Sequence, residues 1–593
     1  MDVLRSRRRV GLMRLAGSLS FAVVAVLACA GMTSSAVALP HRDAADGFGA
    51  SATSDVAPVG GSAEAKVTDP VPLLELRTGG GADAGWLWTL SAREAASAVT
   101  QHGMVQQDTR LGYLRRQKFT SSHPIYRLRL ISRAAYLLTA SPTERAALVA
   151  SGDFVDEGVL GYAASTRQPG TSALWRMSNG TEWRVVPESR REEFTGRGYA
   201  TDGPLGYVRP TYHRVGAIYF ATWDAHGNQG IIDNSELVYG RRDWWGGVKD
   251  FAGHDAPQRT WHWSDEDWSD LKPSIGYYDD SDPETLEKHV AQAKGAGLDH
   301  FSFYWYWNPA GVGDENYVTG LRAFLQARNR SDIDFAVMPC LHPWGDGSTS
   351  LQLPAGQIDR AAQVLVDEYL AQPNYLRAND GRPILEICDT RGIGSGSAEG
   401  SDLPAVRQFT DAVRARAKAK LGEDVLILRN SDLGLDDTAA GIDGQQCQGQ
   451  FDSSRSYPRY VDNQRAFFAS RPGILVRCAT SHFDERPRIA IQIPDPQPAT
   501  DESLEAAFRW YPDQSLAEFR RLLGFVRQDM AESTRPQLVD NMVLLYAWNE
   551  WHEGGYVEPN VKDGCGYLNA ARAAFQLRGS GCVTNPPLPT RTP

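Results

Sequence analysis

The spacing of hydrophobic residues changes near residue 211, which divides the chain into two regions of different architecture. From Val215 onward, short apolar runs alternate with helical stretches, the pattern of repeated βα units. The last apolar run, residues 542–547, suits a strand buried on both faces of a parallel sheet. Predicted strands cover 215–221, 298–307, 333–341, 374–376 with 381–387, 425–428, 441–446, 474–478 and 542–547. Eight such strands predict an α/β fold of the (β/α)8 TIM-barrel type within residues 211–580.

Helix signals separate these strands. Asp282 is a capping residue, Pro283 suits the first helical turn, and Glu284 favours the positive end of the helix dipole. Gly297 is expected to end this helix. A second helix, residues 516–530, should lead into the eighth strand.

Residues 69–210 contain a sequence that is repeated three times. Its marker is Leu-Gly-Tyr, which ends at Tyr113, Tyr162 and Tyr207. One copy is too small to bury its own core, so we expect a small, mainly β domain whose three copies close around a pseudo-threefold axis. Each copy has two strand patterns and a helical turn: 74–76, 86–89 and 91–94; 125–130, 136–139 and 141–145; 174–177, 183–186 and 187–193.

This repeat resembles a threefold repeat of unknown function that is often appended to secreted bacterial hydrolases. The resemblance leaves two interpretations open. The domain is either a carbohydrate-binding module or a rigid spacer.

The N-terminus has the pattern of an export signal. Arginines at 5 and 7–9 precede an apolar stretch at 15–32, and Ala36-Val37-Ala38 is a cleavage site of the A-x-A type. We therefore expect a signal peptide at 1–38, a flexible linker at 39–68 and a C-terminal tail at 581–593. The mature protein should be secreted, without an integral membrane segment; an uncleaved anchor and lipid attachment at Cys29 are the alternatives.

Composition narrows the class of partner. A net charge of −11 argues against nucleic acid or an anionic membrane surface. The 16 Trp, 22 Tyr and 20 Phe fit either sugar binding or large cores. The cysteines outside the signal show no metal-ligand spacing, and no phosphate-binding loop is present, so we expect no metal, no cofactor and a monomer. Cys565–Cys582 is the favoured disulfide and Cys447–Cys478 a second one, whereas Cys340 and Cys388 are expected to be buried thiols.

Two carboxylates directly follow the eighth strand. Glu550 and Glu553 lie three residues apart in the run 548–555, so one turn can hold both near one substrate bond. Cleavage of a glycosidic bond needs such a pair. The alternative is that both glutamates lie on a solvated helix face, but the neighbouring Trp548, Trp551 and Gly554 are not expected on such a face.

The run 548–554, followed by Glu558-Pro559, resembles the C-terminal motif of glycoside hydrolase family 99, the endo-α-mannosidases. It equally resembles the WbsX-like group, which is often labelled glycosyltransferase. The resemblance implies a glycan substrate and retention through a 1,2-anhydro sugar. Glu550 would act as base on the sugar's 2-hydroxyl, and Glu553 as general acid and then base, with a raised pKa. His552 would bind a sugar hydroxyl.

The other candidate contacts lie where predicted strands end. Barrel core is the alternative for the aromatic residues of 298–307, a structural role for His342, and an ion pair with Arg486 for Asp484. The candidate substrate-binding residues are Tyr219, Trp223, Tyr304, Tyr306, His342, Trp344, Asp484, Trp548, Asn549 and His552.

The favoured function is a secreted, retaining and endo-acting glycoside hydrolase of α-linked, mannan-like polysaccharide. A glycosyltransferase is the second hypothesis, which export disfavours because nucleotide-sugar donors are intracellular. A carbohydrate-binding protein without catalysis is the third, which the intact glutamate pair disfavours.

Overall fold

The computed structural model describes residues 70–589, except 79–84, 108–110, 169–170, 181, 211, 225–231, 233–235, 237–241, 254–265, 311–314, 344–350, 431–433, 449–451, 472 and 489–507. The expected signal peptide, the linker and Trp344 lie outside the described residues. Within the described ranges, no helix combines the length and the apolar character needed to cross a membrane.

Three copies of one strand arrangement form residues 74–208. In each copy the first strand pairs antiparallel with the second strand and with the strand after the helix. The first copy contains β2 (Leu74–Arg77), β3 (Trp86–Thr89), α1 (Ala92–His102) and β4 (Val105–Gln107). The second contains β6 (Ser122–Leu130), β7 (Tyr136–Thr139), α2 (Pro142–Ala150) and β8 (Phe154–Ala164). The third contains β9 (Ser172–Ser178), β10 (Trp183–Pro187), η1 (Glu188–Arg190), α3 (Arg191–Gly196) and β11 (Ala200–Val208).

Ion pairs join the three copies to one another. A short ladder between β1 (Val71–Pro72) and β5 (Tyr113–Leu114) lies beside the first copy. Each junction between two copies contains an arginine–glutamate ion pair, so the same type of interaction joins the copies at all three junctions. The pairs are Arg127–Glu94 at 2.8 Å, Arg176–Glu144 at 2.7 Å and Arg184–Glu75 at 3.3 Å.

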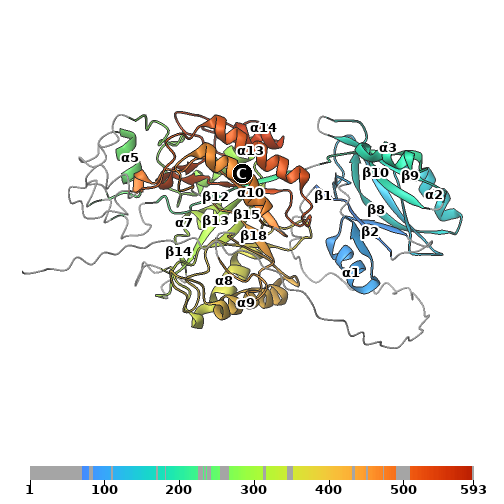
Figure 1. Cartoon of the computed structure of the whole chain (residues 1–593), viewed down its shortest axis with the longest axis horizontal. Helices are drawn as coiled ribbons and strands as arrows, with labels where there is room; N and C mark the ends of the chain where they lie inside the picture. The colour runs from blue at the N-terminus through green and yellow to red at the C-terminus, as the bar shows by residue number, and fades with distance from the viewer. Residues whose placement is uncertain are drawn as a thin grey trace, which may run out of the picture. The chain divides into compact units, whose positions relative to one another are not determined.

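Parallel strands of the second region follow one another in chain order (Figure 1). The first strand pairs with both the second and the last. Between the third and fourth strands, a parallel bridge joins Cys340 to Asp389, and Cys388 N donates to Pro339 O at 2.9 Å. The strands are β12 (Arg214–Tyr219), β13 (His300–Trp307), β15 (Asp334–Pro339), β16 (Ile384–Ile387), β17 (Leu426–Asn430), β18 (Gly444–Gln446), β19 (Leu475–Thr480) and β20 (Met542–Tyr546).

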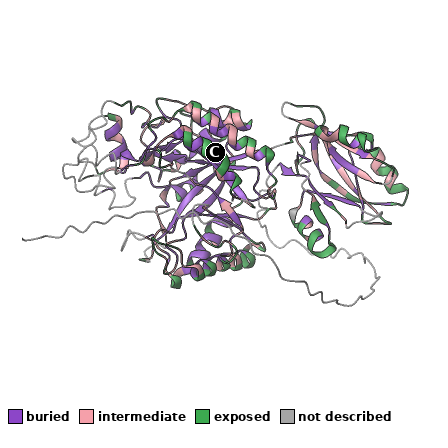
Figure 2. Cartoon of the chain, viewed as in Figure 1, coloured by how far each residue is buried: buried purple, intermediate pink, exposed green. Residues whose placement is uncertain are grey.

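Helices and short elements connect these strands. The strands are buried, whereas the helices keep an exposed outer face (Figure 2). Such a layout is a mixed α/β fold with its core around the sheet. The helices are α5 (Gly246–Gly253), α6 (Pro283–Ala296), α7 (Thr319–Gln326), α8 (Ile358–Val364), α9 (Leu403–Leu421), α10 (Tyr457–Ala469), α13 (Leu516–Glu532) and α14 (Gly566–Phe575). The short elements are β14 (Glu315–Asn316), η3 (Arg330–Asp332), η5 (Ala355–Gln357), η6 (Leu365–Leu370) and η7 (Arg486–Arg488).

Local sequence signals set the bounds of α6. The Asp282 side chain accepts a hydrogen bond from Glu284 N at 2.9 Å, which satisfies a free N–H of the first turn. Gly297 ends the helix with φ of 89°, a conformation that glycine adopts without steric cost. Both ends of this helix therefore lie where the sequence predicts them.

Several strand predictions were too long, and those for 333–341 and 381–387 shorten to Asp334–Pro339 and Ile384–Ile387. Residues 374–376 form no strand, and Tyr375 makes a single bridge to Phe335. The sixth strand begins at Gly444 rather than at 441. A Cβ on Gly444 would lie 2.6 Å from the Ile474 side chain, so this glycine is needed for close packing beside β19.

Three disulfides are present among the described residues. Cys565–Cys582 and Cys447–Cys478 are the pairings expected from the sequence. Cys340 and Cys388, expected as free thiols, are also bonded, with Cα atoms 4.7 Å apart. That expectation was wrong because the two residues follow neighbouring strands, a proximity that their separation of 48 residues hides.

Candidate active site

A tight hairpin follows β20 and carries both candidate carboxylates. Strands β21 (Asn549–Glu550) and β22 (Gly555–Tyr556) pair antiparallel, and η8 (Trp551–Glu553) joins them. The hairpin is tied to β12 because Trp548 N donates to Ile218 O at 2.6 Å. Glu550 and Glu553 therefore lie at the closed end of a hairpin that is held to the parallel sheet.

Both glycines of the motif are required by close packing. Gly554 has φ of 62°, and a Cβ there would lie 2.7 Å from the backbone nitrogen of Asp484. A Cβ on Gly555 would lie 2.4 Å from the Tyr546 ring. The Asp484 segment can approach the hairpin for this reason, and Asp484 N donates to Glu553 O at 2.6 Å.

Glu553 is bound by a cation and by a hydroxyl. Arg488 donates from Nη1 to one carboxylate oxygen, and the Tyr546 hydroxyl donates to the other. The Glu553 side chain is still 22% exposed, so it reaches the surface of the protein. Two donors, one of them charged, therefore hold the Glu553 side chain in place.

Glu550 has the opposite environment. It is 8% exposed, and burial raises its pKa well above the ordinary carboxyl value. The negative charge of Glu553 raises the pKa further, whereas the Arg488 guanidinium lowers it. The sequence prediction expected the raised pKa on Glu553. In the structure, burial raises the pKa of Glu550, and Arg488 and Tyr546 donate to Glu553.

Tyrosines surround the pair. Tyr304 and Tyr306 lie two residues apart on β13, with ring centroids 6.2 Å from each other. Burial raises the pKa of both hydroxyls well above the ordinary value, and the charge of Glu550 acts in the same direction. The Tyr304 hydroxyl accepts a hydrogen bond from Gln448. Neutral hydroxyls beside two carboxyl groups can bind the hydroxyls of a sugar.

His552 packs among indole rings beside the pair. Its ring centroid lies 4.7 Å from that of Trp223 and 6.1 Å from that of Trp244. Burial lowers its pKa to about 3, so the imidazole is neutral at physiological pH. Near it, Trp551 stacks on Tyr556 at 4.0 Å.

Four expected substrate contacts have no accessible surface and need correction. Tyr219, Trp223, Trp548 and Asn549 are all 0% exposed. The Tyr219 hydroxyl lies 2.8 Å from Nδ1 of His289. The Asn549 amide accepts from Phe220 N at 2.8 Å and donates to Phe220 O at 2.9 Å. These side chains support the site from within the core and do not line it.

Asp484 also differs from its expected role. It is 6% exposed and forms an ion pair with Arg486 at 2.6 Å, and Arg486 binds Glu266 as well. The ion pair was the alternative that the sequence left open. Asp484 therefore holds the loop after β19 in place and offers no free carboxylate oxygen pair to a substrate.

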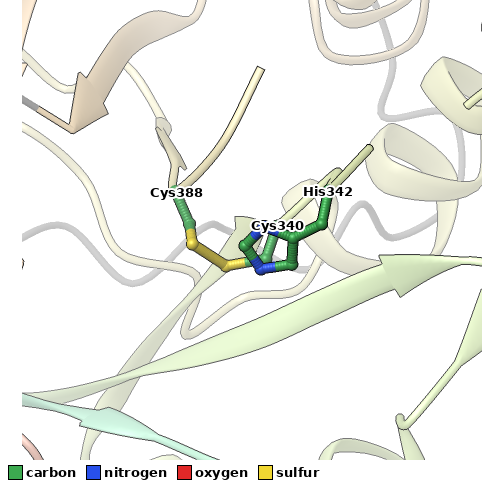
Figure 3. Close-up of side chains that lie close together, drawn as sticks. All are labelled: Cys340, His342 and Cys388. Carbon is green, nitrogen blue, oxygen red and sulfur yellow. A yellow bond between two sulfur atoms is a disulfide. The ribbon is translucent and has the colours of Figure 1, made fainter. Parts of the chain in front are cut away.

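His342 lies at the end of β15 beside the disulfide. Its Nδ1 is 2.8 Å from Asp389, and its ring centroid is 6.2 Å from that of Tyr306. The Asp389 pKa is lowered to about 2 by the His342 and Arg391 hydrogen bonds, which outweigh burial. Nitrogen and sulfur atoms of Cys340, His342 and Cys388 lie within 4.8 Å of one another. Figure 3 shows that the two sulfurs are bonded, which removes both thiolates as metal ligands.

Three residues at the site escaped prediction. Arg488 is distant from the motif in sequence, and a lone arginine in a loop carries no signal of its own. Gln448 lies beyond β18 in an irregular segment. Glu558 belongs to the motif, and its role is structural: it accepts from Tyr278 at 2.9 Å and from Trp551 at 3.1 Å, which anchors the hairpin.

The structure thus combines an α/β fold with a pair of carboxyl groups on a hairpin that follows the last parallel strand, β20. Residues 510–571 match the family model described as glycosyltransferase WbsX, and residues 82–209 match a domain of unknown function, DUF5648. The uncharacterized protein WxcX of Xanthomonas campestris pv. campestris is 24% identical over 335 residues, 55% of this chain and 44% of WxcX. The chain thus spans less than half of the curated relatives that it matches.

Solved structures with a similar course of the chain include the GH99 endo-alpha-mannosidase from Bacteroides thetaiotaomicron. It is 15% identical with a TM-score of 0.37, and 61% of this chain and 96% of that chain are covered. A glycoside hydrolase-like protein is 14% identical with a TM-score of 0.39, covering 62% and 94%. The resemblance to the WbsX-like group that the sequence predicts is found again in the family-model match of residues 510–571.

Proposed function

We propose that the chain is a retaining glycoside hydrolase that cleaves α-linked, mannan-like glycans internally, with Glu550 and Glu553 as its catalytic pair. The observation that carries the proposal is the shared environment of these two carboxyl groups. They lie on one hairpin, a single cation acts on both, and three tyrosines surround them. A pair of this kind can hold one proton, as acid–base cleavage of an acetal requires.

We also infer that the eight parallel strands close into a (β/α)8 barrel. The strands follow chain order, and the last pairs with the first. The Cys340–Asp389 bridge connects the remaining two edges. In such a barrel the residues after the C-terminal ends of the strands share one rim, where active sites lie. Glu550, Glu553 and His342 meet that condition, and Tyr306 lies in the last residues of β13.

The protonation of the pair suggests how substrate starts the reaction. Without substrate, burial favours the protonated form of Glu550. A sugar 2-hydroxyl that donates to Glu550 stabilises its carboxylate and lowers its pKa, which transfers the proton to Glu553. Glu550 then acts as base on the 2-hydroxyl and Glu553 protonates the leaving oxygen, the roles that the family resemblance implies. Neutral His552 and the Tyr304 and Tyr306 hydroxyls would orient the sugar.

The proposal has a direct test. Purified protein is incubated with α-mannan and with α- and β-linked control polysaccharides, products are separated by chromatography, and the anomer formed first is identified by NMR. Release of oligosaccharides with retained configuration from α-mannan is expected. Monosaccharide as the only product would contradict internal cleavage, and an inverted anomer would contradict the mechanism.

A WbsX-like glycosyltransferase is the second candidate, and the match of residues 510–571 favours it. Extension of an acceptor that depends on a nucleotide-sugar donor, without hydrolysis in its absence, would select this function. The N-terminal pattern supports export, and we propose residues 69–210 as a carbohydrate-binding module attached to the catalytic region.

A further inference from the structure

The three Leu-Gly-Tyr motifs meet where the copies of the N-terminal domain (residues 70–209) converge. Each glycine faces a different copy, and an added Cβ would clash there. On Gly112 it would lie 2.7 Å from Val208, on Gly161 3.0 Å from Arg115 O, and on Gly206 2.6 Å from Ala163. The motif is therefore repeated because each copy needs a glycine at its junction with the next.

Backbone pairing between the copies follows the same threefold order. In each pair, the tyrosine of one motif lies opposite a residue of another copy, and that residue comes two positions after the tyrosine of its own motif. Tyr162 pairs with Arg115, Tyr207 with Ala164, and Tyr113 with Arg209. The three tyrosines and their partners consequently form one ring around the pseudo-threefold axis. The partners are Arg115, Ala164 and Arg209.

This ring lines a cavity of about 200 Å³. Tyr113, Tyr162 and Tyr207 all contribute to its wall and are half-buried, as are Arg115 and Arg209. Tyr212 and Arg578, which lie outside residues 70–209, also line the cavity. Tyrosine combines an apolar face with a polar tip and loses little entropy on binding. Three of them around one small cavity suit a single sugar unit.

The two arginines distinguish this cavity from the rest of the domain. Arg127, Arg176 and Arg184 serve folding, and each pairs with a glutamate. Among the described residues, Arg115 and Arg209 have no carboxylate partner, and Nε of Arg209 is buried without a hydrogen bond. Burial lowers the pKa of Arg209, and the charges of Arg578 and Arg115 act in the same direction. With Arg578, three arginines line one cavity, and their guanidinium groups favour an anion there.

The charge of the domain points the same way. Residues 70–209 contain 17 Lys and Arg against 13 Asp and Glu, whereas the whole chain has a net charge of −11. Residues 70–209, which supply most of the cavity's lining, therefore have a positive net charge, whereas the whole chain is acidic.

We propose that the cavity binds an anionic sugar unit, bearing a carboxylate or a sulfate, with the tyrosines against the sugar and Arg115 and Arg209 on the anion. The inference rests on the proposed carbohydrate-binding role of this domain and not on the hydrolytic activity. Its ligand differs from the neutral mannan-like substrate of the proposed active site. The domain would hold the enzyme on an acidic polysaccharide while the second region cleaves a neutral one.

The test uses the full chain and isothermal titration at low salt. Probes are an oligogalacturonate for carboxylate, a sulfated galactan oligosaccharide for sulfate, mannohexaose as neutral sugar, and inorganic sulfate as simple anion. At least one acidic oligosaccharide should bind at least ten-fold more tightly than mannohexaose and inorganic sulfate. Arg209→Gln and Arg115→Gln should each weaken it at least ten-fold, and Tyr207→Ala should weaken it without affecting inorganic sulfate.

Arg93→Gln, an exposed arginine on α1, is the matched control and should leave binding unchanged. Unfolding midpoints show that each variant is folded. Absence of binding by both acidic probes would overturn the inference, as would equal binding in the Arg209 and Arg115 variants. Cleavage of neutral α-mannan by the same samples reports the proposed activity separately, so one proposal can fail while the other stands.

Discussion

Arg488 donates a hydrogen bond to Glu553 and at the same time lowers the pKa of Glu550. One guanidinium therefore acts on both carboxyl groups. It stabilises the charge on Glu553 directly, and it limits how far burial raises the Glu550 pKa. The proton that the pair retains depends on a residue that is 62 positions from the nearer glutamate in the sequence.

Replacing Arg488 with Gln should change the pH dependence of activity as well as its size. Loss of the cation raises the Glu550 pKa further, so the pair keeps its proton to higher pH. We expect kcat/KM to fall about 100-fold, as for loss of one charged group at a reacting centre. The basic limb of the pH–rate profile should move to higher pH. Arg521→Gln on α13, which removes an ion pair remote from the site, is the control. An unshifted basic limb would contradict the role of Arg488.

Leaving-group dependence separates the roles of the two glutamates. Glu553→Gln removes the proton donor, so activity on mannan should fall about 10³-fold. A mannoside with an activated phenolate leaving group needs no donor and should restore most of the rate. Glu550→Gln removes the base, and activity should be lost on both substrates. Initial rates on the two substrates measure this. Rescue of Glu550→Gln but not of Glu553→Gln would reverse the assignment.

The fold was largely predictable because its signals are local. The ends of α6 follow from Asp282, Pro283 and Gly297, and the strand pattern follows from apolar runs that are buried on both faces. Residues 374–376 were misassigned because an apolar triplet looks alike in a strand and in a packed loop. The repeat was visible because Gly112, Gly161 and Gly206 are each required by close packing.

The sequence predicts only those site residues that lie within the motif of residues 548–555. Glu550, Glu553 and the glycines lie in one run, but the distinction between lining and supporting residues depends on tertiary contacts. Trp548 and Asn549 look like sugar-binding residues in the sequence and are fully buried. The contact of Arg488 with Glu553 joins segments 65 residues apart, which one sequence does not encode locally. The ion pair of Asp484 with Arg486 is local, and the sequence offers it as an alternative.

Asn549→Ala should reduce stability rather than substrate affinity. The substitution leaves the backbone N–H and C=O of Phe220 unpaired inside the protein, at a cost of about 2–4 kcal/mol. Urea unfolding at neutral pH measures this loss, and KM for mannan measures any contact with substrate. His552→Ala serves as the comparison, because it should raise KM. A higher KM for Asn549→Ala at unchanged stability would restore Asn549 as a substrate contact.

Removing the Cys340–Cys388 disulfide should destabilise the protein more than removing Cys565–Cys582. The first spans 48 residues and the second 17, and the loss of loop-closure entropy in the unfolded chain grows with loop length. Double Cys→Ala variants should lose about 2–4 kcal/mol by urea unfolding, with the larger loss for the first pair. Alkylation of the unreduced, denatured mature protein should label no cysteine between 340 and 582. Labelling at Cys340 or Cys388 would show that this bond is absent.

Glu386 provides a stability switch that Glu386→Gln should remove. This side chain on β16 is 1% exposed, and burial raises its pKa to about 7. Below the pKa of the unfolded chain, near 4.5, the carboxyl is protonated in both states, so Glu386 imposes no penalty. As pH rises toward 7, the unfolded chain releases this proton while the folded protein retains it, and stability falls by about 1.4 kcal/mol per unit of pKa difference. The variant should therefore match the parent at pH 4.5 and exceed it by about 2–3 kcal/mol at pH 8. Urea unfolding of both proteins at these two pH values measures the difference, and an equal gap at pH 4.5 and pH 8 would show that Glu386 does not titrate between them.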